Sequence, residues 1–487
     1  MPYPTGPLYR AAQIREVERI AIEELGMPGL QLMRSAGMAT FEVLAQRWPV
    51  ARHIAVFCGG GNNGGDGYVM ARLALQAGMQ VEVFSVVDVQ GLRGDALQSH
   101  HDFLAAGGQV QRFDGAVPQA DVIVDALLGT GLTRAVSDDF ERAILAIHAS
   151  ACPVLAVDLP SGLHADTGQV MGCAVHADLT VTFIALKAGL FTGQVANHRG
   201  EVICADLQLP RIAFAGMTAF AHLSQRMPTP RRARDAHKGH FGHLLLVGGN
   251  RGFSGAMRLA GEAALRSGAG LVSIATHPDH AAWLNVGRPE LMCHAVEQLE
   301  ALNALLDKAT AVVMGPGLGQ DDWARTLFEA VLTSGKPCVL DADALNLLAR
   351  LPQRRDDWLL TPHPGEAARL LNCPNAEIAI DRYAAALRLQ TDYGGVCVLK
   401  GAGSIIADAS SLTVATSGNP GMASGGMGDV LAGVCGALMA QGWSMTDAAC
   451  LAVQIHGEAA DEAASEQGER GLLASDLFLP IRRLLNS

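Results

Sequence analysis

Hydrophobic residues in the first half of the chain follow two alternating periodicities. From Gln13 to Leu25 they recur with helical spacing, which predicts an amphipathic helix, and a second helix is expected near residues 30–48. Short continuous apolar runs then alternate with helical patterns, which is typical of strands buried on both faces and predicts a parallel sheet between helices. The expected strands are residues 53–57, 81–87, 122–127, 154–158, 179–184 and 202–205.

The same alternation starts again at residues 243–247, with further strands expected at residues 271–275, 311–314, 338–340, 358–360 and 396–399. Between the two patterns, residues 226–238 are basic, contain two prolines and lack apolar periodicity, so we interpret them as an interdomain linker. Arg231, Arg232 and Arg234 in this segment leave a binding patch as the alternative. The sequence therefore predicts two three-layer α/β/α domains, residues 1–225 and 226–487.

The amino-acid composition limits the kinds of molecule that the chain is expected to bind. The chain has 487 residues, of which 49% are hydrophobic and 17% charged, as expected for globular domains. A net charge of -12 argues against nucleic acid or an anionic membrane as a general partner, so any phosphate must be held locally. The ten cysteines include no C-x-x-C pair, which favours a reducing compartment, and we expect the cytoplasm. We expect neither a signal peptide nor a membrane span.

The most informative stretch is residues 418–433, in which Asp429 is the only ionisable residue among many glycines. Its first half is expected to be a loop, and a helix rich in small residues should begin near Val430. Glycines at a helix start free backbone N–H groups for a phosphate, and a lone carboxylate beside them suits a proton acceptor. A tightly packed turn is the structural alternative.

A second glycine cluster, residues 59–67, follows the first expected strand, with a helix expected from Tyr68. Its G-x-G-x-x-G spacing, with Glu82 further on, indicates a dinucleotide site, but a charged Asp66 would oppose a pyrophosphate. The oxygens of Asn62 and Asn63 suit a hard cation instead, and Asp125 and Ser161 could add ligands. Residues 129–133 could form another phosphate nest.

Two further residues suggest acid–base chemistry. Asp158 and Lys187 lie at or just after the ends of consecutive expected strands, where they could act on one substrate carbon. Each alone would more often be a loop carboxylate or a solvated lysine. In the second half, loops of Gly, Asp, His and Pro follow the strands at residues 250–257, 315–319, 341–346, 361–366 and 400–404. His363 and Glu366 lack a helical His partner, so we reject zinc there.

Together these motifs resemble the bifunctional NAD(P)H-hydrate repair enzyme family, in which an epimerase domain is fused to an ADP-dependent dehydratase domain. The resemblance rests on residues 59–67, 125–131, 158–162 and Lys187 in the first half, and on residues 315–319, 341–346, 361–366, 400–404 and 418–429 in the second. It covers nearly the whole chain except residues 1–8 and the linker. It implies a Rossmann-like first domain and a ribokinase-like second domain.

The resemblance also implies residue roles. In the epimerase, substrate would be held by Asn62, Asn63, Gly64, Gly65, Asp66, Gly129, Thr130, Gly131, Leu132, Thr133, Arg134, Ala135 and Asp158, with potassium (K+) on Asn63, Asp125 and Ser161. In the dehydratase, Ala256, Gly317, His363 and Asp429 would hold the hydrate, and Lys400, Gly401, Ala402, Gly403, Ser404 and Gly428 would hold ADP, with Mg2+ as a further cofactor. Asp158, Lys187 and Asp429 would be catalytic.

The implied partners are the hydrates NADHX and NADPHX, and ADP, without nucleic acid or membrane; we expect a homo-oligomer of a size that the sequence leaves open. The epimerase would interconvert the R and S hydrates, and the dehydratase would restore the S form while converting ADP to AMP and phosphate. Three alternatives remain open at this point: a ribokinase-like ATP-dependent small-molecule kinase fused to a dinucleotide-binding module, a non-enzymatic dinucleotide sensor, and an NAD-dependent dehydrogenase.

Overall fold

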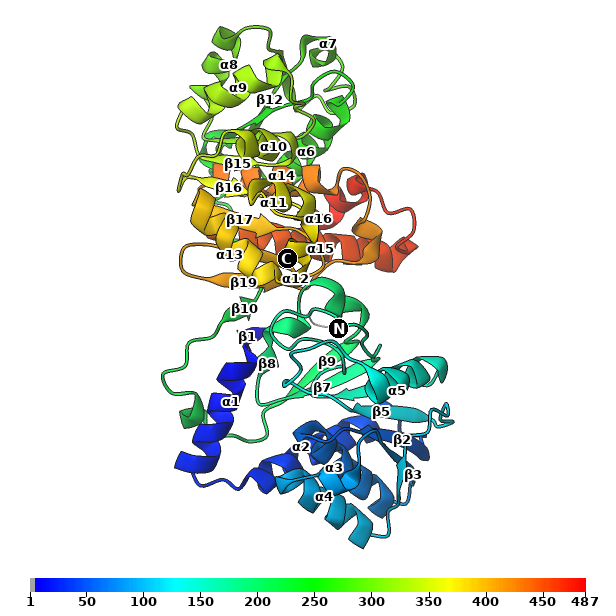
Figure 1. Ribbon diagram of the computed structural model, residues 1–487. Helices are drawn as coiled ribbons and strands as arrows, with labels where there is room; N and C mark the ends of the chain where they lie inside the picture. The colour runs from blue at the N-terminus through cyan, green and yellow to red at the C-terminus, as the bar shows by residue number, and fades with distance from the viewer. Residues whose placement is uncertain (1–4) are drawn as a thin grey trace. The chain divides into compact units, whose positions relative to one another are not determined.

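The computed structural model describes residues 5–487 and divides into two compact units, Gly6–His222 and Leu223–Ser487 (Figure 1). The division falls close to the boundary predicted after residue 225. Residues 1–4 of the predicted first domain lie outside the described residues. No described helix combines the length and the apolar character that crossing a bilayer requires.

The N-terminal unit is built on a parallel sheet with the strand order β4-β3-β2-β5-β6-β7-β9. The strands are β2 (His53–Cys58), β3 (Gln80–Ser85), β4 (Val110–Arg112), β5 (Val122–Ala126), β6 (Val154–Val157), β7 (Leu179–Phe183) and β9 (Glu201–Ala205); short β1 (Gly6–Tyr9) pairs in parallel with β8 (Leu186–Lys187). Alternate residues of β2 enter different cores: Ile54 and Val56 lie in one cluster, Ala55 and Phe57 in the other. The predicted parallel sheet buried on both faces is confirmed.

The strand order reverses direction between β2 and β5, and in such sheets ligands bind at the carboxyl ends of the strands beside this point. The helices are α1 (Ala11–Arg19), which continues as the π-helix η1 (Ile20–Glu24), α2 (Gly29–Arg47), α3 (Asn62–Gln76), α4 (Gly94–Ala105) and α5 (Asp138–Ala149).

The start of α3 corrects the sequence prediction, because the helix begins at Asn62 and not at Tyr68. The glycines of this first turn serve close packing more than loop formation. A Cβ on Gly64 would lie 2.1 Å from the Gly59 carbonyl oxygen, and one on Gly67 would lie 2.6 Å from the Ala126 Cβ. The helix therefore approaches the ends of β2 and β5 more closely than any larger side chain would allow.

In the C-terminal unit the strand order is β13-β12-β11-β14-β15-β16-β17-β18-β19; neighbours from β13 to β17 are parallel, and β18 is antiparallel to both β17 and β19. The strands are β11 (His243–Val247), β12 (Leu271–Thr276), β13 (Met292–Ala295), β14 (Ala311–Met314), β15 (Cys338–Leu340), β16 (Trp358–Leu360), β17 (Val396–Leu399), β18 (Ser404–Ala407) and β19 (Leu412–Ala415); β10 (Ala221–Leu223) lies where the two units divide. Six of these strands were predicted from the sequence. Five of the six have the predicted bounds, and the sixth, β12, is one residue longer than predicted.

The helices of this unit are α6 (Ser254–Arg266), α7 (Pro278–Ala281), α8 (Leu299–Leu306), α9 (Asp322–Thr333), α10 (Ala342–Arg350), α11 (Pro364–Leu370), α12 (Asn375–Ile380), α13 (Arg382–Tyr393), α14 (Met427–Ala440), α15 (Met445–Gln467) and α16 (Phe478–Leu484). Helix α14 is buried along most of its length between α6 and the sheet. Small residues permit this contact: a Cβ on Gly433 would lie 2.2 Å from the Ala260 carbonyl oxygen.

Helix α14 begins earlier than predicted. Gly426 takes a left-handed conformation (φ 92°) and the helix starts at Met427, so Asp429 lies in the first helical turn and not in the loop. The carboxylate is consequently carried by a rigid, buried element.

Arg232 in the predicted linker makes specific contacts. Its guanidinium donates to the carbonyl oxygen of Gly268 (2.5 Å) and to Gln441 Oε1 (3.1 Å), and it lies 3.6 Å from the centre of the Phe241 ring. Arg231, Arg232 and Arg234 are all exposed, and Arg232 also contacts the C-terminal unit.

Candidate active sites

Asp158 and Lys187 form a buried ion pair in the N-terminal unit. Lys187 is only 1% exposed, and its Nζ donates to Asp158 Oδ1 (2.5 Å), Thr182 Oγ1 (2.9 Å) and the Phe183 carbonyl oxygen (2.7 Å). Asp158, directly after β6, has φ 65°, a conformation that costs a non-glycine residue roughly 1–3 kcal/mol. The structure thus excludes a solvated Lys187, and it brings the pair together as predicted.

Two more carboxyl groups are coupled to this pair. Burial raises the pKa of Asp66 in α3 well above its ordinary value, and the charges of Asp158 and Glu18 raise it further. Burial, followed by the charge of Asp158, also raises the pKa of Glu18 in α1. Glu18 was missed, because a glutamate bordering the apolar face of a helix carries no sequence signal.

The predicted cation ligands come from three elements: Asp125 lies at the end of β5, Ser161 follows the neighbouring strand β6, and Asn63 lies in the first turn of α3. Asp125 is fully buried; its Oδ1 accepts from Ser161 Oγ (2.6 Å) and its Oδ2 from Ser161 N (2.7 Å). Burial raises the pKa of Asp125 to about 6. Both polar atoms of the Asn63 side chain are buried without a protein partner. The orphaned amide oxygen of Asn63 and the buried oxygens of Asp125 and Ser161 are of the kind that a hard cation prefers.

The loop after β5 begins beside this group of oxygens. A Cβ on Gly129 would lie 3.4 Å from Asn63 Oδ1. Residues 129–135 beyond it are half-buried or exposed and precede α5. The structure therefore joins the start of the predicted substrate loop to the predicted cation ligands.

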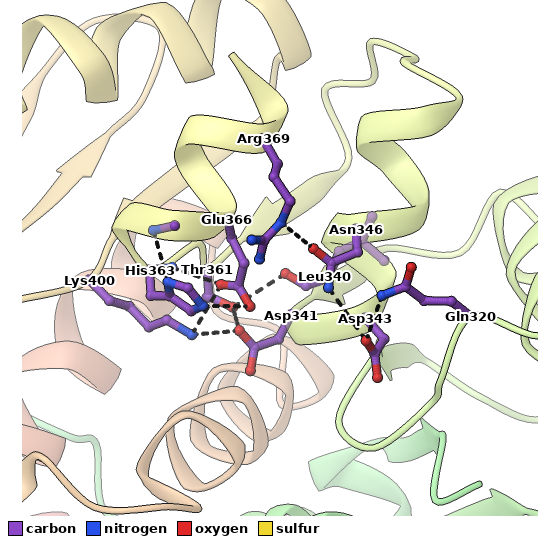
Figure 2. A network of polar contacts seen from close by, with 11 residues as sticks. Gln320, Leu340, Asp341, Asp343, Asn346, Thr361, His363, Glu366, Arg369 and Lys400 are labelled. Carbon is purple, nitrogen blue, oxygen red and sulfur yellow. Dashed lines mark hydrogen bonds and ion pairs between the residues drawn. The ribbon is translucent and has the colours of Figure 1, made fainter. Parts of the chain in front are cut away.

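In the C-terminal unit the central feature is the ion pair of Lys400 with Asp341 (Figure 2). Lys400 Nζ lies 2.7 Å from Asp341 Oδ1, which also accepts from Thr361 Oγ1 (2.9 Å). Gly428 lies directly against the pair, because a Cβ there would be 3.3 Å from Lys400 Nζ. Burial raises the pKa of Asp429 to about 7; the charge of Asp341 adds to the rise and that of Lys400 opposes it.

His363 and Glu366 form a helix cap. Glu366 Oε2 accepts from the His363 backbone N (2.8 Å), and His363 Nδ1 accepts from Gly365 N (2.9 Å) at the start of α11. Burial, then the positive charges of Lys400 and Arg369, lowers the pKa of His363. The His363 ring is half-exposed, and its positively charged form is disfavoured by these surroundings.

The remaining predicted residues fall into two places. Gly317 (φ 58°) lies against Ala256, since a Cβ on Gly317 would be 3.3 Å from the Ala256 Cβ. Lys400–Ser404 divides: the Lys400 side chain points to Asp341, whereas residues 401–404 form the turn between β17 and β18, in which Gly401 N donates to Ser404 Oγ (3.2 Å).

Arg382 supports this turn and was missed from the sequence. It is 5% exposed, and its Nη2 donates to the carbonyl oxygens of Leu399 and Lys400, each at 3.2 Å. Burial lowers the pKa of Arg382 to about 10. An arginine at a helix start gives no local sign that it will be buried behind a loop that it braces.

Each half of the chain matches a known protein family. Residues 29–189 match the model of the YjeF-related protein N-terminus, and residues 244–483 match the model of NAD(P)H-hydrate dehydratase. The bifunctional NAD(P)H-hydrate repair enzyme Nnr of Coxiella burnetii is 49% identical over 98% of this chain and 99% of its own length. The Escherichia coli enzyme of the same name is 45% identical over 98% and 94%.

The crystal structure of a ribokinase-like superfamily protein from Enterococcus faecalis has a TM-score of 0.50 and 29% identity, covering 53% of this chain and 91% of that one. Fold and sites thus define a two-domain α/β enzyme whose second domain is ribokinase-like. Given the matches along nearly its full length, the chain belongs to the family of bifunctional NAD(P)H-hydrate repair enzymes. This membership favours repair over the kinase, sensor and dehydrogenase alternatives.

Proposed function

We propose that the chain repairs hydrated NADH and NADPH in two steps. The N-terminal domain, residues 1–225, epimerises the R and S hydrates, and the C-terminal domain, residues 226–487, dehydrates the S form while converting ADP to AMP and phosphate. The observation that carries this proposal is the same in both units: a buried Lys–Asp pair at the carboxyl ends of parallel strands, with a carboxyl group of raised pKa beside it.

In the dehydratase, Asp429 is the proton acceptor. Its pKa of about 7 suits a general base at neutral pH, and its place in the first turn of α14 puts it beside backbone N–H groups that favour phosphate. Asp429 would take the proton of the substrate hydroxyl while the oxygen of this hydroxyl receives a phosphoryl group from ADP, which leaves as AMP. Loss of phosphate from the substrate would then restore the nicotinamide ring.

The other predicted dehydratase residues would bind the two substrates, the hydrate and ADP. Ala256, Gly317 and His363 would hold the hydrate with Asp429. Gly428 and residues 400–404 would hold ADP, with Lys400 kept in place by Asp341. Among the described residues no group of three His, Cys, Asp or Glu could hold a metal, so we expect Mg2+ to be bound mainly by the phosphates of ADP.

In the epimerase, Asp158 and Lys187 would exchange protons at the hydrated carbon. Residues 62–66 and 129–135 would bind the dinucleotide, and Asn63, Asp125 and Ser161 would hold potassium. A bound potassium ion would supply a fixed positive charge among buried oxygens. The orphaned Asn63 amide supports this ligand set. We further propose a cytoplasmic homo-oligomer.

The direct test feeds the purified chain a mixture of R and S NADH hydrates and follows the recovery of NADH absorbance. Complete recovery is expected with ADP and potassium. Without ADP nothing should recover, and without potassium the S form should disappear quickly while the R form lags. Recovery that is independent of ADP would contradict the dehydratase assignment, and full conversion of the R form by a Lys187→Met variant would contradict the epimerase assignment.

A further inference from the structure

A cavity of about 880 Å³ in the C-terminal unit lies beside the dehydratase site and has no assigned role. It is lined by side chains from α10, α11 and the loops that follow β14 and α11. Its volume is within the range of small-molecule sites. Gly365 belongs to its wall and is two residues from His363, so the cavity begins where the predicted hydrate site ends.

The side chains that line this cavity carry positive charge. Arg350 and Arg369 line it, four amide side chains accompany them, and none of the described residues in its wall is Asp or Glu. The chain as a whole carries a net charge of -12. A cationic cavity in an acidic protein favours an anionic ligand.

One carboxylate orients both arginines through neutral amides, and Figure 2 shows the branch of this network that ends at Arg369. Asp343 Oδ1 lies 3.3 Å from Gln320 Nε2 and 3.4 Å from Asn346 Nδ2. The carbonyl oxygens of these amides in turn accept from the arginines: Gln320 Oε1 from Arg350 Nη2 (2.6 Å) and Asn346 Oδ1 from Arg369 Nε (2.7 Å). Both guanidinium groups are thus positioned without being paired directly to an acid.

Such an arrangement suits a phosphate. An oriented guanidinium offers a planar fork of N–H donors to phosphate oxygens, and its remaining charge is not neutralised by the amide that holds it. Helix α11 connects the two sites: the charge of Arg369 is close enough to contribute to the lowered pKa of His363. A dinucleotide that reaches Asp429 with its nicotinamide end must place its phosphates some distance away.

We infer that Arg350 and Arg369, held by the Asp343–Gln320–Asn346 network, form a phosphate subsite for the hydrated dinucleotide. The inference rests on the dehydratase function proposed above. The phosphate is either the bridging pyrophosphate, which both hydrates carry, or the 2′-phosphate, which only the NADPH hydrate carries. The subsite contributes binding and takes no part in proton transfer.

The test compares Arg350→Gln and Arg369→Gln in the full chain, with the purified S hydrates of NADH and NADPH as substrates. Each substitution should raise the KM for the NADPH hydrate roughly tenfold or more, as expected when a hydrogen bond to a charged group is lost, and should leave kcat within about threefold. The KM for ADP should not change. Arg369→Lys should recover part of the loss, because it restores the charge without the fork.

Arg325→Gln is the matched control, since Arg325 is an exposed arginine on α9 that pairs only with Asp322. It should leave both KM values unaltered, and thermal unfolding should show that all variants are folded. A raised KM for both hydrates identifies the pyrophosphate, and a rise for the NADPH hydrate alone identifies the 2′-phosphate. Unaltered KM values for both, a loss confined to kcat, or a raised KM for ADP would overturn the subsite. The unmodified chain's turnover of the NADH hydrate tests the proposed function separately.

Discussion

Replacing Asp429 by Asn separates proton transfer from every other contribution of the dehydratase site. The substitution keeps the size and buried position of the side chain in α14 but removes its ability to accept a proton. General-base catalysis typically contributes about 10²–10⁴-fold to kcat, which corresponds to about 3–5 kcal/mol of transition-state stabilisation. We expect a loss of kcat in that range with little change in the KM for the hydrate or ADP.

The pH profile provides the sharper measurement. With a pKa of about 7, Asp429 is about half ionised at pH 7 and about a tenth ionised at pH 6, so kcat of the unmodified chain should rise with pH through about 7. This limb should vanish in the Asn variant. Absorbance recovery from the S hydrate of NADH, measured from pH 5.5 to 8.5, gives kcat for the unmodified chain and for the Asn variant. The epimerisation rate is the internal control.

The same group affects stability with the opposite sign. The folded-state pKa is raised from 3.8 to about 7, so between these values the native state binds more protons than the unfolded state, and the free energy of unfolding falls as pH rises. The Asn variant should escape this loss and unfold at a higher temperature at pH 8. If the variant kept its full kcat, or the same acid limb, Asp429 would not be the base.

Three further substitutions test other parts of the structure. Lys187→Met should lower the epimerisation rate at least 10²-fold, because Asp158 loses its buried partner. Dehydration of the purified S hydrate should stay within about twofold. Chromatography of the epimers measures the epimerisation rate, and absorbance measures the dehydration rate. Asp125→Asn should abolish the response of epimerisation to added potassium, and an undiminished response in a potassium titration would exclude Asp125 as a ligand. Gly64→Ala should lower the free energy of unfolding by about 1–3 kcal/mol, since its Cβ would lie 2.1 Å from the Gly59 carbonyl oxygen; Gly61→Ala, which would meet nothing within 4 Å, is the control in denaturant unfolding.

The positions of the strands were predictable because a strand buried on both faces must be a continuous apolar run. This condition is local, and it predicted β14, β15, β16 and β17 with their observed bounds. The short half-buried strands β13 and β4 lack such a run and were not predicted. Helix starts were predicted less well: α3 and α14 begin at glycine-rich segments, whose residues disfavour a helix locally but permit close packing.

The candidate site residues could be named from the sequence because several glycine-rich and acidic motifs occur together in the order found in one enzyme family, although each residue alone has an ordinary structural interpretation. The sequence by itself therefore determined the two α/β sheets, the family and the positions of Asp158, Lys187 and Asp429. Only the tertiary structure decided that Glu18 is coupled to Asp158, that Arg382 braces a turn, and that Asp343 orients Arg350 and Arg369 through two amides. Each of these effects depends on burial or on a through-space distance between segments far apart in the chain, and a local pattern of residues encodes neither.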